Sequence, residues 1–157
     1  MRVVLIPIDG SPHAEVAVRC IIEQAQHDRF GAIHLVNVRP PLSAYAARFV
    51  ARRAVRDFQH ERGVQALARA RRLLDEAWLA YHAHILEGET GRVIACAADE
   101  LGAHEVILGA RSWIGHPLQW WLAAQIRRYA SVPVVMMMAP RPALAPAHTF
   151  DPAVPRS

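Results

Sequence analysis

The chain has 157 residues, of which 53% are hydrophobic, enough for one domain that buries its own core without disulfides. No apolar run approaches the roughly 18 residues of a membrane span, and the N-terminus lacks a secretory pattern, so we expect a cytoplasmic protein with no membrane contact. The 18 basic residues outnumber 14 acidic ones, but the densest arginine run, Arg48 to Arg72, is interleaved with acids, which is typical of a solvated helix and not of a nucleic-acid surface.

The first elements are a strand and a helix joined by a short turn. Residues 3–8 form an apolar run that predicts a strand. In the turn after it, Ser11 suits a helix N-cap and Pro12 suits the first helical position. We therefore expect a helix from Pro12 to about His27, followed by a second strand over residues 33–38.

The longest segment between strands, residues 40–81, combines two patterns. Its second part predicts an amphipathic helix with an apolar side formed by Val64, Leu67, Leu74 and Trp78. Its first part begins with two prolines and is expected to pass from a loop into a helix. The path of residues 42–60 stays open, and these residues could form a mobile flap.

The rest of the chain continues the alternation of strand and helix. The predicted elements are a strand at residues 82–86, a helix at 91–101, a strand at 105–108, a helix carrying Trp121, Leu122, Ile126 and Tyr129, and a strand at 132–138. Such alternation favours an α/β, doubly wound, five-stranded parallel sheet with helices on both faces, a Rossmann-like fold with expected strand order 3-2-1-4-5. We expect one domain over residues 1–138. Residues 139–157 hold five of the 11 prolines and predict a disordered or surface-draped tail.

The two cysteines, Cys20 and Cys96, fall in apolar helical patterns and show no C-x-x-C spacing. Free cysteine is among the most buried residue types. We therefore predict two small buried hydrophobic side chains, with a disulfide or a catalytic thiol as the less favoured alternative.

Ligands of open α/β sheets bind beyond the carboxyl ends of the strands, near the point where the strand order reverses. The candidate positions are residues 9–11, 38–41, 88–90 and 109–117.

At these positions the chain resembles a known family. The segments "VVLIPIDGSPHAEVAV", "IHLVNVRPP", "LEGETGRVIACAADELGAHEVILGARS" and "IRRYASVPVVMM" are together similar to the universal stress proteins, in their single-domain bacterial type. The resemblance implies that Asp9 and Val38 match the positions that hold adenosine. It also implies a phosphate motif of the form G-x2-G-x9-G-(S/T), whose glycines allow backbone N–H groups to surround anionic oxygens.

The phosphate motif is degenerate in this chain. Gly109 matches the first glycine, but Ser112 stands at the second, and Trp120 and Trp121 stand at the final pair in a loop two residues shorter than the motif. Large indoles at a place of close backbone approach predict a lost phosphate site.

An alternative reading is a rebuilt, shorter phosphate site. In that interpretation the Arg111 guanidinium binds a phosphate through two hydrogen bonds, and Gly115 lets the backbone approach the phosphate at a new position. Pro117 begins a helix whose first N–H groups are free to bind it. The cofactor is then ATP, ADP or AMP, with magnesium in the case of ATP.

No enzymatic constellation accompanies the nine histidines. His82 and His84 share one face of a strand and could ligate a metal, but a surface position at a strand edge is favoured. Ser11 has no recognisable base. We expect no metal and no enzyme, with slow hydrolysis of a bound nucleotide left open.

The last strand is apolar, and an edge strand must be covered or paired. The resemblance implies a homodimer through Val134, Val135 and Met136, and the alternative is that the tail covers the strand. The expected function is a non-catalytic stress or regulatory module with an altered nucleotide pocket. The alternatives are an adenine-nucleotide switch and a small-molecule binder lined by Trp113, Trp120 and Trp121.

Overall fold

The computed structural model describes residues 1–41, 48, 52–111 and 117–139. Within these residues strands and helices alternate along the chain, and the tail predicted at 139–157 lies outside the described residues from residue 140 onward. The elements are β1 (Arg2–Pro7), α1 (Pro12–Gln24), β2 (Phe30–Arg39), α2 (Arg52–Glu76), β3 (His82–Glu87), α3 (Thr90–Glu100), β4 (Glu105–Ala110), α4 (Pro117–Tyr129) and β5 (Val134–Met138).

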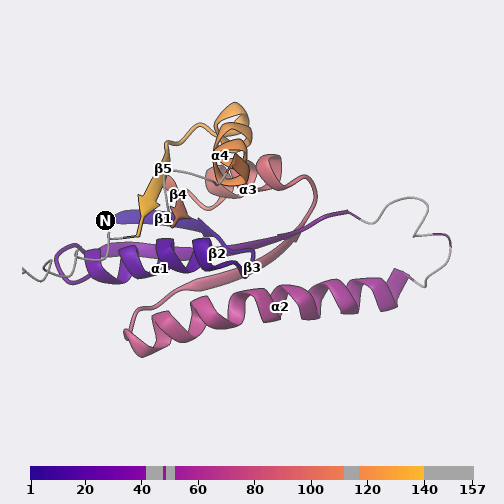
Figure 1. Cartoon of the computed structure of the whole chain (residues 1–157), viewed down its shortest axis with the longest axis horizontal. Coiled ribbons are helices and arrows are strands. Elements are labelled where there is room, and N and C mark those ends of the chain that lie inside the picture. The colour runs from indigo at the N-terminus through magenta and orange to yellow at the C-terminus, as the bar shows by residue number, and fades with distance from the viewer. Residues whose placement is uncertain (42–47, 49–51, 112–116, 140–157) are drawn as a thin grey trace, which may run out of the picture.

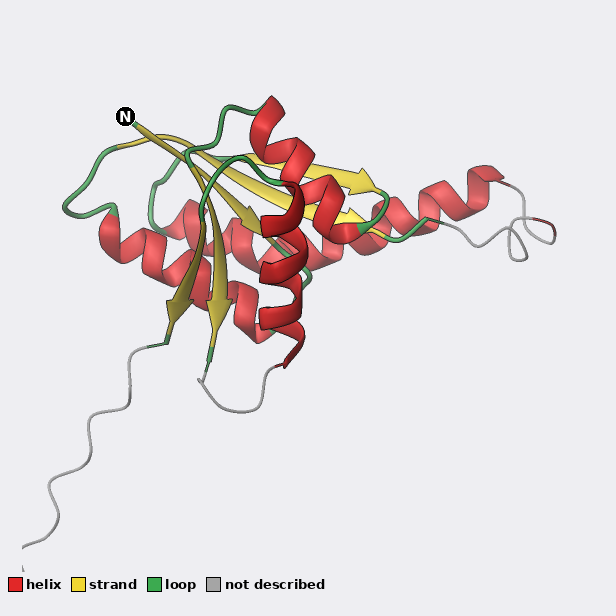
Figure 2. Ribbon diagram, turned by 90° about the horizontal axis from the view of Figure 1, so that it is seen from above, coloured by secondary structure: helices red, strands yellow, loops and turns green. Residues whose placement is uncertain are grey.

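The five strands form one parallel sheet in the order β3-β2-β1-β4-β5. Helices α1 and α2 cover one face of the sheet and α3 and α4 cover the other (Figure 1). The strands fan out with the twist that such sheets have (Figure 2). The predicted doubly wound α/β fold and its strand order are confirmed. The order reverses at β1, whose neighbours are β2 and β4.

The start of α1 follows the sequence prediction. Ser11 is the N-cap, and its hydroxyl oxygen accepts a hydrogen bond from the Ala14 N–H at 3.5 Å. Pro12, which has no N–H to satisfy, occupies the first turn. The helix ends at Gln24, earlier than the predicted His27, because the Gln26 and His27 N–H groups bond to carbonyls three residues back, in a tighter turn than the α-helix.

Helix α2 ends in a turn that the helical periodicity does not predict. Trp78 has a φ of 57°, in the left-handed region, and its side chain is 94% exposed. The Leu79 N–H bonds back to the Leu74 carbonyl at 3.0 Å, so the chain reverses and Leu79 packs on the core. The prediction of Trp78 on the buried side was wrong. None of the described helices, α2 included, is long and apolar enough to cross a membrane.

The prediction that both cysteines are buried was also wrong. Cys96 is exposed on α3 and Cys20 is partly exposed on α1. The neighbours of Cys96, Ala95 and Ala97, are the residues that α3 buries against the sheet and α4. Cys96 is exposed because the helical period places it on the outer side of α3 with the exposed Arg92 and Asp99.

Helix α2 approaches the sheet closely at Gly63. A Cβ atom at this position would lie 2.8 Å from Ile85 Cγ2 on β3 and 3.1 Å from Asn37 Oδ1 on β2. Contacts this short force neighbouring atoms to move. Gly63 is therefore a packing residue, although glycine weakens a helix interior.

We predict that Gly63→Ala destabilises the protein by about 1–3 kcal/mol, the usual cost of overpacking a core. At a helix position with free space the same change stabilises by roughly 0.5–1 kcal/mol, so the sign of the effect tests the packing. Urea unfolding of both proteins measures it. Gln65→Ala, at an exposed position of the same helix, should stay within about 0.5 kcal/mol of the wild type. A Gly63→Ala variant more stable than the wild type would contradict the packing described here.

Candidate functional site

A small cavity lies at the carboxyl ends of β1, β2 and β4, where the strand order reverses. Its volume is about 50 Å³. This is the position at which open α/β sheets bind ligands. Its lining comes from the strand ends, α1, α3 and α4: Pro7, Ile8, Asp9, Ala14, Val36, Val38, Thr90, Ile94, Leu108, Gly109, Gln119 and Leu122.

Asp9 stands at the mouth of this cavity and shapes the turn after β1. Its Oδ1 accepts a hydrogen bond from the Ser11 N–H at 2.9 Å, and Gly10 between them has a φ of 83°. This Asx-type turn carries the chain from β1 to the N-cap of α1. Asp9 thus has a structural role in the turn as well as a place in the cavity wall.

Asn37 of β2 hydrogen-bonds to the residue that follows β1. This residue is 1% exposed, and its Nδ2 donates to the Ile8 carbonyl at 2.6 Å. Its Oδ1 is buried without a hydrogen-bond partner. A buried polar side chain among apolar neighbours is costly unless it bonds, so we assign Asn37 the role of holding Ile8 and, through it, Asp9. Sequence reasoning missed Asn37, whose only signal is an amide inside an apolar strand.

Val38 and Gly109, predicted from the resemblance, both line the cavity with Asp9. Gly109 also packs directly against the backbone of α1. A Cβ atom at this position would lie 1.9 Å from the His13 carbonyl oxygen of α1. The close packing of α1 on β4 therefore requires glycine here, whether or not a phosphate binds.

Helix α4 contributes other residues to the cavity than Trp120 and Trp121, which the sequence suggested. Helix α4 places Gln119 and Leu122 in the cavity lining. Trp121 is 59% exposed and Trp120 is 37% exposed, and neither lines the cavity. Trp113 lies outside the described residues. The bulk on this side of the site therefore comes from Gln119 and Leu122, because these positions of α4 face the strand ends.

The remaining predicted residues are only partly described. Arg111 is exposed, and its backbone N–H donates to His13 Nδ1 at 3.3 Å. Its side chain does not line the cavity. Ser112 and Gly115 lie outside the described residues.

The chemistry of the lining is mainly apolar. Asp9, Thr90 and Gln119 are its polar side chains, and no arginine or histidine is among the described residues that line it. Sites that hold a drug-sized ligand usually measure about 300–1,000 Å³, whereas this cavity measures about 50 Å³. Among the described lining residues, a polyphosphate would meet a carboxylate and no cationic side chain.

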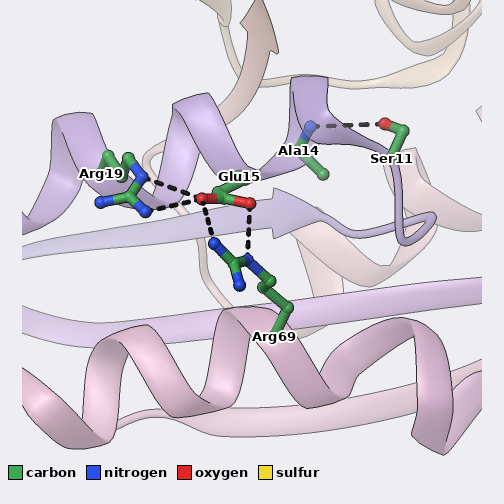
Figure 3. A network of polar contacts seen from close by, with 5 residues as sticks. All are labelled: Ser11, Ala14, Glu15, Arg19 and Arg69. Carbon is green, nitrogen blue, oxygen red and sulfur yellow. Dashed lines mark hydrogen bonds and ion pairs between the residues drawn. The ribbon is translucent and has the colours of Figure 1, made fainter.

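A second cavity, of about 220 Å³, lies on the other side of the turn, between α1 and α2. Glu15 of α1 lines it and joins the two helices (Figure 3). Its Oε2 accepts from Arg69 Nε of α2 at 2.8 Å, and its Oε1 accepts from Arg19 Nη2 at 2.7 Å. These hydrogen bonds, first from Arg69 and then from Arg19, lower the pKa of Glu15 from 4.5 to about 2. Arg69 is thereby engaged in holding α2 beside the turn.

Comparison with protein families gives one match. The model described as "Universal stress protein family" matches residues 1–137. No curated protein sequence matches the chain.

Solved structures share the fold at low sequence identity. A universal stress family protein from Burkholderia pseudomallei is 22% identical, with 87% of this chain and 96% of that chain covered and a TM-score of 0.67. A family protein from Arabidopsis thaliana with AMP bound is 15% identical, with 90% and 94% covered and a TM-score of 0.64. The universal stress protein from Archaeoglobus fulgidus in complex with dAMP is 18% identical, with 87% and 97% covered and a TM-score of 0.58.

We predict that Glu15 stabilises the protein at neutral pH and ceases to do so in acid. Because folding lowers its pKa from 4.5 to about 2, its contribution is complete above pH 4.5 and is lost as the pH falls toward 2. Glu15→Gln should cost about 1 kcal/mol or less at pH 7, as expected for partly exposed ion pairs.

Urea unfolding of the wild type and Glu15→Gln across this pH range measures the effect. Glu23→Gln is the matched control, since Glu23 is exposed on the same helix and forms no ion pair among the described residues. A gap between wild type and Glu15→Gln that stays constant from pH 7 to pH 2.5 would show that the ion pairs do not stabilise the fold.

Proposed function

The chain belongs to the universal stress protein family, and from this premise we propose that it is a dimeric, non-catalytic regulatory protein whose pocket does not hold ATP. A cytoplasmic location, expected from the sequence, is part of this proposal. The protein acts through its surface and its assembly, and the cavity at the strand ends is a remnant of a nucleotide site.

The observation that carries the proposal is the composition of the cavity. A triphosphate brings several negative charges, which need cations or many N–H donors to replace their water. The described lining offers Asp9 and no cationic side chain. Arg69 of α2 bonds to Glu15 and lines the second cavity, so it does not contribute to this lining. Gly109 is explained by the packing of α1.

A second candidate is a switch that binds an adenine nucleotide with a single phosphate. Two proteins of the same fold carry AMP and dAMP, and Asp9, Val38 and Gly109 line one cavity in this chain. A monophosphate brings less charge than ATP and requires a shorter cradle. In this candidate Arg111, Ser112 and Gly115 hold the phosphate, and magnesium is needed only for ATP.

We predict no saturable heat when ATP or ADP, with and without magnesium, is titrated into nucleotide-free protein by isothermal titration calorimetry. AMP is titrated in the same way, and the proposal predicts no heat for it either. Saturable binding of ATP would overturn the proposal. Binding of AMP alone would establish the second candidate in its place.

Any binding that is found must be assigned to this site. Asp9→Ala should then abolish it, because Asp9 lines the cavity, while Asp75→Ala, on the exposed side of α2, should leave the affinity unchanged. Equal affinity in Asp9→Ala and the wild type would place the nucleotide elsewhere.

The proposed dimer forms through β5, the edge strand next to β4. The backbone groups on the outer side of an edge strand are a template for pairing with another strand. Val134 is buried, while Val135 and Met136 are partly exposed, so a partner strand would bury apolar surface there. The alternative is that residues 140–157 cover the outer edge of β5 in place of a partner strand. Those residues lie outside the described structure.

We predict that Val135→Asp converts a dimer into a monomer, because a charge at this edge opposes the burial of apolar surface. Molar mass from light scattering after size-exclusion chromatography measures this. The control is Ala83→Asp, at an exposed position of β3 on the opposite edge of the sheet. An unchanged dimer mass for Val135→Asp, with the circular dichroism of the wild type, would place the interface elsewhere. If Val135→Asp does not fold, Met136→Lys provides the same test.

A further inference from the structure

Three histidines gather on one face of β2 and β3. In the parallel register His34 pairs with His82, and Val36 pairs with His84. Because side chains alternate between the faces of a strand, His34, His82 and His84 project from the same face, the one that α3 and α4 cover at Val36 and Leu86. The sequence indicated the pair on β3 but not His34, which the strand register adds.

The rings of this histidine cluster are in direct contact. Nδ1 of His34 lies 3.1 Å from Nε2 of His84. The rings of His34 and His82 stack with their centroids 5.2 Å apart. His34 is 8% exposed, while His84 is partly exposed and His82 is exposed, so one edge of the cluster is open to solvent.

From this arrangement we infer that the cluster binds a divalent transition-metal ion of the type that imidazole prefers, such as zinc, nickel or copper(II). Two imidazole nitrogens on one tetrahedral zinc ion, each about 2.05 Å from the metal, are separated by about 3.3 Å. The separation of 3.1 Å between His34 Nδ1 and His84 Nε2 is close to this value. An ion that takes this place breaks the hydrogen bond between the two nitrogens, so the donating ring must carry its proton on its other nitrogen and both rings must turn their lone pairs toward the ion.

The third ligand requires His82 to move. No three His, Cys, Asp or Glu side chains of the described residues are arranged to hold an ion as they stand, because His82 lies flat against His34. Its side chain is exposed, and the rotation of a histidine ring about its last bond is soft. His82 can therefore leave the stack and complete the site, with water at the remaining position.

The electrostatics of the cluster suit a metal. Burial lowers the pKa of both His34 and His84, and the charge of neighbouring histidines lowers it further. Both shifts favour neutral imidazole, which is the form that coordinates metals. An ion at this place links β2 to the edge strand β3.

The test is titration of the full-length, untagged protein, freed of metal by a chelator, with zinc and nickel chloride in a calorimeter. We expect one ion per chain and a rise in the melting temperature, because an ion that binds only the folded state stabilises it. His84→Ala and His82→Ala should each weaken binding by roughly 10- to 100-fold or more, since the loss even of a residue that only hydrogen-bonds a metal ligand costs that much.

His27→Ala is the control, because His27 is exposed in the turn after α1 and its replacement should leave the affinity unchanged. Copper(II) gives an independent readout, since its electron paramagnetic resonance spectrum reports how many imidazole nitrogens coordinate it. We expect fewer in His84→Ala than in the wild type. If His84→Ala does not fold, the exposed position His82 decides the question. An absence of binding to the wild type, or equal affinity in His82→Ala and His27→Ala, would overturn the inference.

Discussion

The close contact between α1 and β4 determines how the site of this protein is built. A side-chain atom on Gly109 would lie 1.9 Å from the His13 carbonyl, so the backbones of the helix and the strand touch directly. The Arg111 N–H continues this contact by bonding to His13 Nδ1. As a result the end of β4, the turn at Asp9 and the first residues of α1 meet at one small cavity.

Because of this contact, a glycine at position 109 is not by itself evidence that a phosphate binds. In the family resemblance, Gly109 is the one phosphate-motif glycine that this chain retains, and its retention suggests a retained ligand. The packing of α1 gives a sufficient reason for glycine without any ligand. The same holds for Asp9, whose carboxylate orders the turn before α1. Residues of a nucleotide site can therefore survive the loss of the nucleotide because the fold uses them too.

The sequence predicted the parts of the structure that depend on local patterns. Apolar strands alternating with helices sufficed for the parallel sheet, the expected order came from the Rossmann-like arrangement, and Ser11 with Pro12 sufficed for the start of α1. Features that depend on three-dimensional register could not be predicted. The helical period placed Trp78 in the core because it does not show where α2 ends. Cys96 is a different kind of error, because the helical period by itself places this residue with the exposed Arg92 and Asp99. On α4 the cavity is lined by Gln119 and Leu122 and not by the tryptophans between them, a choice of helix side that the sequence pattern did not indicate. His34 joined His84 only through the pairing of β2 with β3.

Strand β2 connects the two regions to which chemistry can be assigned. Val36 and Val38 line the cavity, and His34 lies two residues earlier on the same face, about 7 Å along the strand. His84, the register partner of Val36, stands beside the cavity wall from β3. An ion held by His34 and His84 would restrain β2 and β3 at Val36, the residue that both regions share. Coupling between distant sites needs an element whose state both can bias. Val36 and its register partner His84 place the two regions side by side on one face of the sheet, so coupling between them would require β2 and β3 to have a second arrangement that both regions bias.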